Sequence, residues 1–326
     1  MKKKIAIVAG GDSSEVVVSL KSAAGLNSFF DHNQYDVYLV VLKQKNWYVA
    51  LEADIQISID KNDFSFLYNN EKICFDFAYI TIHGTPGENG LLQGYFELIG
   101  LPYSGCQVLA SALTFNKFSC NHYLKAYGIS IAESLLLRKG QTIAIQDIED
   151  RIGFPCFIKP NEGGSSFGVT KVKTQDQVEK ALNDAFNESD EVMIEAFMPG
   201  TEVTCGIYSG LNGIRILPVT EVVTPNEFFN FDAKYNGQVE EITPARLSDD
   251  LTNRIQQLTR AIYEILGCKG IIRNDYIIGA DNTIRLLEVN TTPGMTPTSF
   301  IPQQVRAAGL EMKDVLSEII EKELQN

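Results

Sequence analysis

Long apolar runs are absent from this 326-residue sequence. No segment approaches the roughly 20 apolar residues that a membrane-spanning helix requires. The lysine-rich start is followed by Ile5–Ala9, an apolar stretch that is too short for a secretory signal peptide and is ended by Gly10-Gly11. We therefore expect a cytoplasmic protein that has no membrane partner.

Positive charge is also scarce. The sequence has 28 lysines and arginines against 41 aspartates and glutamates, which gives a formal net charge of −13 at pH 7 and a pI of about 4.8. A nucleic-acid partner requires a basic footprint, so this class of function is excluded. An anionic small molecule such as ATP requires only a few local cations, which an acidic chain can supply.

The sequence also lacks closely spaced cysteines. The six cysteines form no CxxC pair, and no histidine cluster accompanies them. Reduced, mostly buried thiols are therefore expected rather than disulfides or a zinc site.

Apolar residues, at 44%, are abundant enough for two or three compact domains. Up to about residue 105, short apolar runs alternate with glycine turns and stretches of helical spacing. This alternation predicts an α/β domain with a parallel sheet over residues 1–105. Its predicted strands are Ile5–Ala9, Tyr35–Leu42 and Phe77–Ile82, with edge strands at Trp47–Leu51 and Ile55–Ile59 and a helix capped by Asp12 or Ser13.

After residue 105 the pattern becomes that of α+β domains. A single helix is predicted over Val108–Tyr127, ending at Gly128. The later elements divide into a second domain at 106–197 and a third at 198–326. The predicted strands are Ser134–Leu137, Cys156–Lys159, Val169–Val172, Val192–Glu195, Glu202–Tyr208, Ile214–Val222, Ile271–Ile278 and Ile284–Val289, and the predicted helices are 144–151, 175–187, Leu251–Leu266 and Met312–Leu324.

The clearest polar pattern lies on a predicted hairpin whose turn is Gly279–Asn282. With an even-length loop, Asp275 and Glu288 share one face as diagonal partners. Arg273 and Asn290 lie on the same face, because side chains alternate along a strand. Two carboxylates and an amide oxygen suit Mg²⁺ that also holds substrate phosphates. The alternative is a solvated outer face, which the surrounding Ile, Tyr and Leu disfavour.

A second pattern joins a lysine to a glycine- and serine-rich loop. Lys159 ends an apolar strand, and the loop Asn161–Gly168 follows it. Backbone N–H groups and hydroxyls of such a loop can cover phosphate oxygens that the lysine also meets. The lysine precedes the loop, so this is not a Walker A motif. Taken alone, the segment fits an ordinary hairpin loop equally well.

Three further segments could surround a ligand. Gly10-Gly11 lets the backbone approach a ligand before a helix that begins near Glu15, but the missing GxGxxG fingerprint disfavours a dehydrogenase. Phe228–Tyr235, a connection with aromatic and charged residues, suggests a lid. N–H groups of the turn Asn290–Thr296 could bind an oxyanion. Each has a plain alternative: a favourable first-turn acid, a packed surface loop and a simple turn.

These patterns belong to a longer ordered series. It comprises Gly10-Gly11 with Ser13, Glu15 and Val18-Ser19-Leu20; His83-Gly84 with Gly87-Glu88 and Gly90; Leu92-Gln93-Gly94; Leu101–Gly105; Lys117; Ile158-Lys159-Pro160; Gly164–Gly168; Ala233-Lys234-Tyr235; Arg273 with Asp275; and Glu288–Thr296. In this order the motifs resemble the D-alanine–D-alanine ligases, within the ATP-grasp enzymes, along nearly the whole chain. The resemblance implies three domains, with ATP between the second and the third.

The resemblance also implies a reaction. One D-alanine carboxylate attacks the γ-phosphoryl group of ATP, and the amine of a second D-alanine attacks the acylphosphate, giving D-alanyl-D-alanine for peptidoglycan, ADP and phosphate. Two Mg²⁺ ions, with Mn²⁺ as a substitute, and a lid that excludes water are implied. The implied partners are ATP, D-alanine and a second copy of the chain in a homodimer.

Residue roles follow from the same resemblance. The implied Mg²⁺ ligands are Asp275, Glu288 and Asn290. The implied ATP site comprises Lys117 and Lys159 at the phosphates, Ser165 and Ser166, Glu195 with the backbone of Ala196, Phe197 and Met198 at adenine, Glu202 at the ribose, and Lys234. The implied amino-acid site comprises Glu15 and His83 for the first D-alanine, Arg273 and Gly294 for the oxyanion, Ser299 and Phe300 for the second carboxylate, and Glu15, Ser165 and Tyr235 linking the lid to the site.

The sequence departs from the family pattern in places. Gly163 and Ala196 stand where many relatives carry Glu and Lys, Thr85-Pro86 replaces a commoner pair, and about twenty residues within 43–72 look inserted. Tyr235 matches the dipeptide-forming relatives. The alternatives that stay open are another ATP-grasp ligase, including one that uses D-lactate, a silent nucleotide-binding protein and a nicotinamide oxidoreductase.

Overall fold

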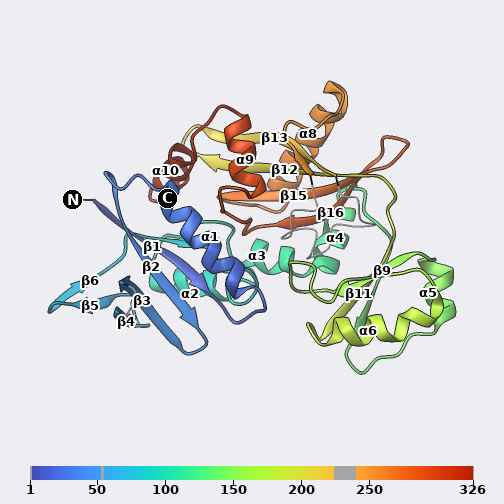
Figure 1. Ribbon diagram of the computed structural model, residues 1–326, viewed down its shortest axis with the longest axis horizontal. Coiled ribbons are helices and arrows are strands. Elements are labelled where there is room, and N and C mark those ends of the chain that lie inside the picture. The colour runs from blue at the N-terminus through green and yellow to red at the C-terminus, as the bar shows by residue number, and fades with distance from the viewer. Residues whose placement is uncertain (1, 53–54, 224–239, 326) are drawn as a thin grey trace.

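The computed structural model describes residues 2–52, 55–223 and 240–325. Three larger sheets and one small hairpin make up its β-structure, and helices pack between and around the sheets (Figure 1). The predicted lid Phe228–Tyr235 lies outside the described residues, and so do Lys234 and Tyr235. No helix within the described ranges is long and apolar enough to cross a membrane.

The N-terminal sheet has the strand order β4-β3-β2-β1-β7. Its centre is parallel, as predicted, and antiparallel strands extend one edge. Residues 5–9 are buried because both faces of a parallel sheet are covered. The strands are β1 (Lys3–Gly10), β2 (Tyr35–Lys43), β3 (Asn46–Glu52), β4 (Ile55–Ser58) and β7 (Phe77–Ile80), and the separate hairpin is β5 (Phe66–Tyr68) with β6 (Glu71–Ile73).

The first helix, α1 (Val16–Phe29), starts differently from the prediction. Neither Asp12 nor Ser13 caps it, since Glu15 occupies the N-cap position and its side chain makes no capping bond. The Ser13 hydroxyl instead donates to the carbonyl of His83 at 2.8 Å. The turn after β1 is thereby tied to the turn after β7, and both turns reach the same cavity.

The predicted helix over residues 108–127 is two helices, α3 (Val108–Phe115) and α4 (Lys117–Lys125). Asn116 separates them with an extended backbone, and its side chain accepts a hydrogen bond from Ser119 N–H at 3.1 Å. The N-cap preference of asparagine therefore outweighs the continuous apolar pattern. The break makes Lys117 the first residue of a new helix.

The central sheet is antiparallel, with the order β10-β9-β11-β8. Its hydrophobic core draws all of its buried members from residues 135–194. The strands are β8 (Ser134–Arg138), β9 (Cys156–Pro160), β10 (Thr170–Val172) and β11 (Glu191–Ala196), and the helices are α5 (Ile145–Arg151), the short 3₁₀ turn η1 (Gln175–Gln177) and α6 (Val178–Phe186).

The C-terminal sheet is antiparallel, with the order β14-β13-β12-β15-β16. It shares a core with the N-terminal sheet, because α1 packs against the last two helices (Figure 1). A second helix of the N-terminal region is α2 (Leu91–Ile99). The C-terminal elements are β12 (Thr201–Gly210), β13 (Gly213–Val223), β14 (Glu240–Ile242), α8 (Asp249–Ile265), β15 (Ile271–Ile278), β16 (Ile284–Asn290), α9 (Phe300–Ala307) and α10 (Met312–Glu323).

The β15–β16 hairpin corrects the predicted register. Ile278 pairs with Ile284, so the connecting loop has an odd number of residues, and a register shift follows between Asp275 and Tyr276. This bulge places Asp275 directly opposite Glu288, where the sequence predicted a diagonal pair. The two carboxylates therefore lie closer together than the even-length loop implied.

Candidate active site

Two cavities adjoin between the three sheets. The larger cavity, of about 440 Å³, lies between the central and C-terminal sheets. The smaller cavity, of about 360 Å³, lies between the N-terminal region and the turn that follows β16. Lys117, Ser165 and Glu288 line both, so the cavities meet at these side chains. A reaction between ligands in the two cavities would take place at this border.

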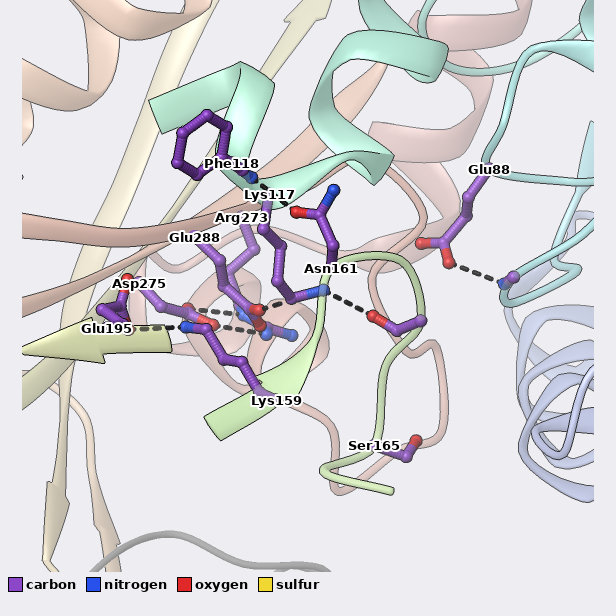
Figure 2. A network of polar contacts seen from close by, with 12 residues as sticks. Glu88, Lys117, Phe118, Lys159, Asn161, Ser165, Glu195, Arg273, Asp275 and Glu288 are labelled. Carbon is purple, nitrogen blue, oxygen red and sulfur yellow. Dashed lines mark hydrogen bonds and ion pairs between the residues drawn. The ribbon is translucent and has the colours of Figure 1, made fainter. Parts of the chain in front are cut away.

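Lys159 and Glu195 form a buried ion pair in the larger cavity (Figure 2). Neighbouring strands β9 and β11 supply them, and Lys159 Nζ donates to Glu195 Oε2 at 2.6 Å. Lys159 is 7% exposed and Glu195 is 2% exposed. Among the described residues, no group donates to the other oxygen, Glu195 Oε1. A buried acceptor that lines a cavity in this way is suited to an N–H donor of a ligand.

The glycine- and serine-rich loop after β9 is held by Lys117. Lys117 Nζ donates to the carbonyl of Gly163 at 2.5 Å and lies 3.9 Å from Glu288 Oε2 (Figure 2). Ser165 and Ser166 both have positive φ, which is unusual for residues other than glycine. The Ser165 hydroxyl donates to Glu15 Oε1 at 2.5 Å. The loop therefore connects α4, the C-terminal hairpin and α1 at the border of the cavities.

Arg273 and Asp275 form a bidentate pair along β15. Arg273 Nε and Nη2 donate to the two Asp275 oxygens at 2.8 and 2.7 Å. The Thr204 hydroxyl on β12 also donates to Asp275, at 2.5 Å. Burial acts to lower the pKa of Arg273, but the Asp275 carboxylate outweighs it and raises the pKa above its ordinary value. The guanidinium lies 5.2 Å from the centre of the Phe300 ring.

Three oxygen donors are arranged on β15 and β16. Asp275 and Glu288 are directly opposed, and Asn290 lies two residues beyond Glu288, on the same face of its strand. The Asn290 side-chain oxygen accepts from Thr292 N–H at 3.0 Å, which fixes its direction. Two carboxylates and an amide oxygen are the hard ligands that Mg²⁺ prefers. The residues present therefore fit a magnesium site beside Lys117.

One end of the smaller cavity contains Glu15 and His83. Glu15 is 4% exposed and His83 is also buried. Burial, followed by the positive charge of Arg273, lowers the pKa of His83 to about 4. His83 is therefore neutral at physiological pH. Its Nε2 lies 3.4 Å from the hydroxyl of Ser22, which also accepts from Met295 N–H at 3.4 Å.

The other end of the smaller cavity is the start of α9. Ser299 occupies the N-cap position, so the N–H groups of the first turn of this helix are at that end. A Cβ atom on Gly294 would lie 3.0 Å from the Ser299 hydroxyl, so a larger residue there would have to displace that side chain. The positive end of a helix dipole and an adjacent hydroxyl suit a carboxylate.

Among the side chains in or beside the site that carried no predicted role are Glu88, Thr204 and Glu241. Glu88 belonged to the family motif and lines the smaller cavity, where Gly84 N–H donates to it at 2.6 Å. Burial and the charge of Glu15 raise the pKa of Glu88 to about 8. An acid between glycines after a buried strand was the available signal for Glu88. Thr204 and Glu241 lie on strands whose sequence pattern carries no such signal.

All of the predicted site residues within the described ranges line one of the two cavities or both. The larger cavity is lined by Lys117, Lys159, Ser165, Ser166, Glu195, Ala196, Phe197, Met198, Glu202, Asp275 and Glu288. The smaller cavity is lined by Glu15, His83, Lys117, Ser165, Arg273, Glu288, Asn290, Gly294, Ser299 and Phe300. The structure therefore gathers these residues around two adjoining cavities, and their roles stay a prediction.

Two antiparallel sheets that enclose a lysine-lined cavity are the arrangement of the ATP-grasp enzymes. Residues 4–106 match the family model "D-ala D-ala ligase N-terminus", and residues 123–321 match "D-ala D-ala ligase C-terminus". The chain is 63% identical to the D-alanine--D-alanine ligase of Bacteroides fragilis over 98% of this chain and 99% of that protein. It is 61% identical to that of Parabacteroides distasonis over 100% and 99% of the two chains. The chain belongs to the D-alanine–D-alanine ligase family.

Solved structures show the same fold. D-alanyl-alanine synthetase A of Vibrio cholerae superposes with a TM-score of 0.90 at 29% identity, covering 100% of this chain and 99% of that one. The VanG D-Ala:D-Ser ligase of Enterococcus faecalis gives 0.88 at 31% identity, covering 99% and 100%. The D-alanine–D-alanine ligase of Bacillus anthracis, solved as a complex with ATP, gives 0.79 at 29% identity, covering 99% and 98%.

Proposed function

We propose that this chain is a D-alanine–D-alanine ligase, which uses ATP to join two D-alanines and releases ADP and phosphate. The observation that carries the proposal is the shared border of the two cavities at Lys117, Ser165 and Glu288. A phosphoryl group held there would lie next to an amino-acid carboxylate. Relatives of this name, at 63% identity over nearly the whole chain, support the same activity.

ATP occupies the larger cavity in this proposal. Lys117 and Lys159 hold its phosphates, and the loop with Ser165 and Ser166 covers them. Glu195 Oε1, the buried acceptor without a donor among the described residues, accepts a hydrogen bond from the amino group of adenine. The remaining contacts are the backbone of Ala196, Phe197 and Met198 at adenine, Glu202 at the ribose, and Lys234.

Asp275, Glu288 and Asn290 would hold two Mg²⁺ ions, or Mn²⁺ in their place. When bound, the ions neutralise phosphate charge that the lysines alone do not offset. The ion pairs of Asp275 with Arg273 and of Glu288 with Lys117 hold both carboxylates in place. The hairpin thus presents its oxygen donors toward the cavity border.

The first D-alanine lies with its ammonium at Glu15, and its carboxylate faces the border of the cavities. Ser165 orients Glu15 through the 2.5 Å hydrogen bond between their side chains. His83, which is neutral, adds polar contact without repelling the ammonium. The carboxylate attacks the γ-phosphorus of ATP, ADP leaves, and an acylphosphate is formed.

The second D-alanine binds at the other end of the smaller cavity. Ser299 and the N–H of Phe300 receive its carboxylate at the start of α9. Its amine attacks the acyl carbon, and Arg273 with the Gly294 N–H stabilises the oxyanion that develops. Collapse of the tetrahedral intermediate breaks the bond to phosphate and completes the peptide bond. Tyr235 joins Glu15 and Ser165 in linking the lid to this site.

Further parts of the proposal concern organisation. The first amino acid binds mainly to a domain of residues 1–105, and ATP lies between domains of residues 106–197 and 198–326. The enzyme is cytoplasmic, acts as a homodimer, and supplies the dipeptide for peptidoglycan synthesis. Its binding partners are small molecules, and it requires neither nucleic acid nor a membrane.

The test is phosphate release from ATP and Mg²⁺, with D-alanine, L-alanine, D-serine and D-lactate supplied singly and in pairs. Release with D-alanine alone, together with a dipeptide identified by mass, is the expected result. Release only with another substrate would retain the ATP-grasp mechanism and refute the assigned amino acid. If no substrate causes phosphate release although ATP binds, the proposed enzymatic activity would be refuted.

A further inference from the structure

Glu241 is a charged side chain of the smaller cavity to which the proposed reaction assigns no role. It lies on β14, an edge strand that pairs with β13 through Val222. The same cavity wall contains Arg273, Ser299 and Phe300, the residues proposed to surround the second amino acid. Glu241 therefore shares this cavity with the residues proposed for the acceptor.

Gln303 on α9 fixes the direction of the Glu241 carboxylate. Its side-chain Nε2 donates one hydrogen bond to Glu241 Oε2 and another to the carbonyl of Thr298, at 2.6 Å. Both hydrogens of that amide are then used, so Gln303 is held at both sides. The carboxylate is positioned by the same helix whose first turn receives the acceptor.

The charge of Glu241 is not offset by an ion pair with any described residue. The cation that acts on it from a distance is Arg273, which already holds Asp275 through two hydrogen bonds and lies over the Phe300 ring. The carboxyl group is partly buried, and this burial raises its pKa. A positioned, partly buried carboxylate at a ligand cavity favours a cationic group of the ligand.

Resting on the proposed function, we propose that Glu241, positioned by Gln303, recognises the ammonium group of the acceptor amino acid. The acceptor is a zwitterion whose ammonium and carboxylate are separated by one carbon. With the carboxylate at Ser299 and Phe300, the ammonium lies within the same end of the cavity as Glu241. The interaction is absent for a hydroxy acid, because a hydroxyl group carries no positive charge. Glu241 therefore selects amines over alcohols as acceptors.

The test replaces Glu241 by Gln, which retains its shape and removes its charge. Loss of a hydrogen bond between charged groups predicts a rise of roughly tenfold in KM for the acceptor D-alanine. The preference for D-alanine over D-lactate should fall by a similar factor, measured as the ratio of dipeptide to depsipeptide by mass. The KM for ATP should not change.

Donor activation is measured separately, as D-alanine hydroxamate formed when hydroxylamine traps the acylphosphate. Glu241→Gln should leave this rate unchanged. The matched control is Glu240→Gln, which removes the same charge from the neighbouring residue of β14, an exposed side chain on the opposite face of the strand. This control should leave both KM and acceptor preference unchanged.

Gln303→Met provides an independent variant that removes the donors and retains the length of the side chain. A rise of about threefold in acceptor KM is expected, because the carboxylate remains but is less well positioned. This variant decides the question if Glu241→Gln does not fold, as judged by thermal unfolding.

An unchanged acceptor KM in folded Glu241→Gln would overturn the inference. Equal losses of hydroxamate and dipeptide would also overturn it, because they would indicate a general structural role. A wild-type protein that forms neither product would instead refute the proposed function, and the inference with it. The two failures are therefore distinguishable.

Discussion

The two cavities hold their carboxylates in different ways. In the larger cavity, Glu195 and Asp275 are each bound by a basic side chain, Lys159 and Arg273. In the smaller cavity, apart from Glu288 at the border, which pairs with Lys117, three carboxylates accept hydrogen bonds from neutral groups. These pairs are Glu15 with the Ser165 hydroxyl, Glu88 with Gly84 N–H, and Glu241 with the Gln303 amide.

This difference matches the charges of the proposed ligands. A lysine that is held by a carboxylate stays in place and can still donate to phosphate oxygens, because its ammonium group has three hydrogens. A carboxylate that accepts hydrogen bonds only from neutral groups can pair with an ammonium group of a ligand when it is ionised, whereas Glu88, whose pKa is raised to about 8, holds a proton at neutral pH. The first arrangement suits a polyanion and the second suits amino acids.

The largest effect is expected at the border of the cavities, from Glu288→Gln. Removing the charge takes away a proposed metal ligand and the ion partner of Lys117. Phosphate release should fall by about 10²–10³-fold, because phosphoryl transfer depends on neutralising charge. The thermal unfolding temperature should stay close to that of the wild type, since this carboxylate is not in the core. Activity near the wild-type rate would refute the metal site on the hairpin.

The second-largest effect is expected in the larger cavity, from Lys159→Met. This change leaves Glu195 as a buried carboxylate without its ion partner, so the free energy of unfolding should fall by about 3–5 kcal/mol. ATP binding, measured by calorimetry, should also weaken. The double variant Lys159→Met with Glu195→Gln should regain most of the stability without regaining ATP binding. Recovery of both would show that Lys159 has no direct part in holding phosphates.

A third prediction concerns Glu88 in the smaller cavity and the pH dependence of the free energy of unfolding. Burial and the charge of Glu15 raise the pKa of Glu88 from 4.5 to about 8 in the folded protein. Between these two pH values Glu88 is protonated in the folded state and ionised in the unfolded state. The free energy of unfolding should therefore decrease as pH rises from about 4.5 through about 8. Urea unfolding at several pH values should show that Glu88→Gln removes this decline. Parallel curves for variant and wild type would contradict the assignment.

The smallest effect is expected from Thr204→Val. The change removes the 2.5 Å hydrogen bond to Asp275 and retains the volume of a side chain that is almost fully buried. One such bond contributes about 1 kcal/mol, so the Mg²⁺ concentration required for half-maximal activity should rise about fivefold. The KM for D-alanine should not change, since Thr204 lines neither cavity. A change in that KM with constant Mg²⁺ dependence would place the role of Thr204 elsewhere.

Local sequence patterns were sufficient for most of the strands. Buried strands such as β1 and β7 were visible as short apolar runs between glycine turns, because a parallel sheet requires both faces to be apolar. The edge strands β3 and β4 were also predicted, although their antiparallel direction was not. The residues of the family motifs that the structure describes line the two cavities.

The errors came from features that a local pattern does not contain. The break at Asn116 was missed because apolar spacing continues across it, although a single cap residue is enough to start a new helix. The bulge beside Asp275 was missed because it depends on packing of the whole sheet. Glu241 reaches the cavity only through the position of its edge strand, and the resemblance assigned it no role.

The separate core of the central sheet bears on how the nucleotide enters and leaves. All buried members of that core come from residues 135–194, whereas the N-terminal and C-terminal sheets share another core. The central sheet and its helices can therefore rotate as a rigid body about the segments that connect them to the rest of the chain, without disrupting either core. Because the larger cavity lies between the central and C-terminal sheets, such a rotation would widen this cavity and release the ADP of the proposed reaction. If opening is slower than peptide-bond formation, turnover will decrease with solvent viscosity.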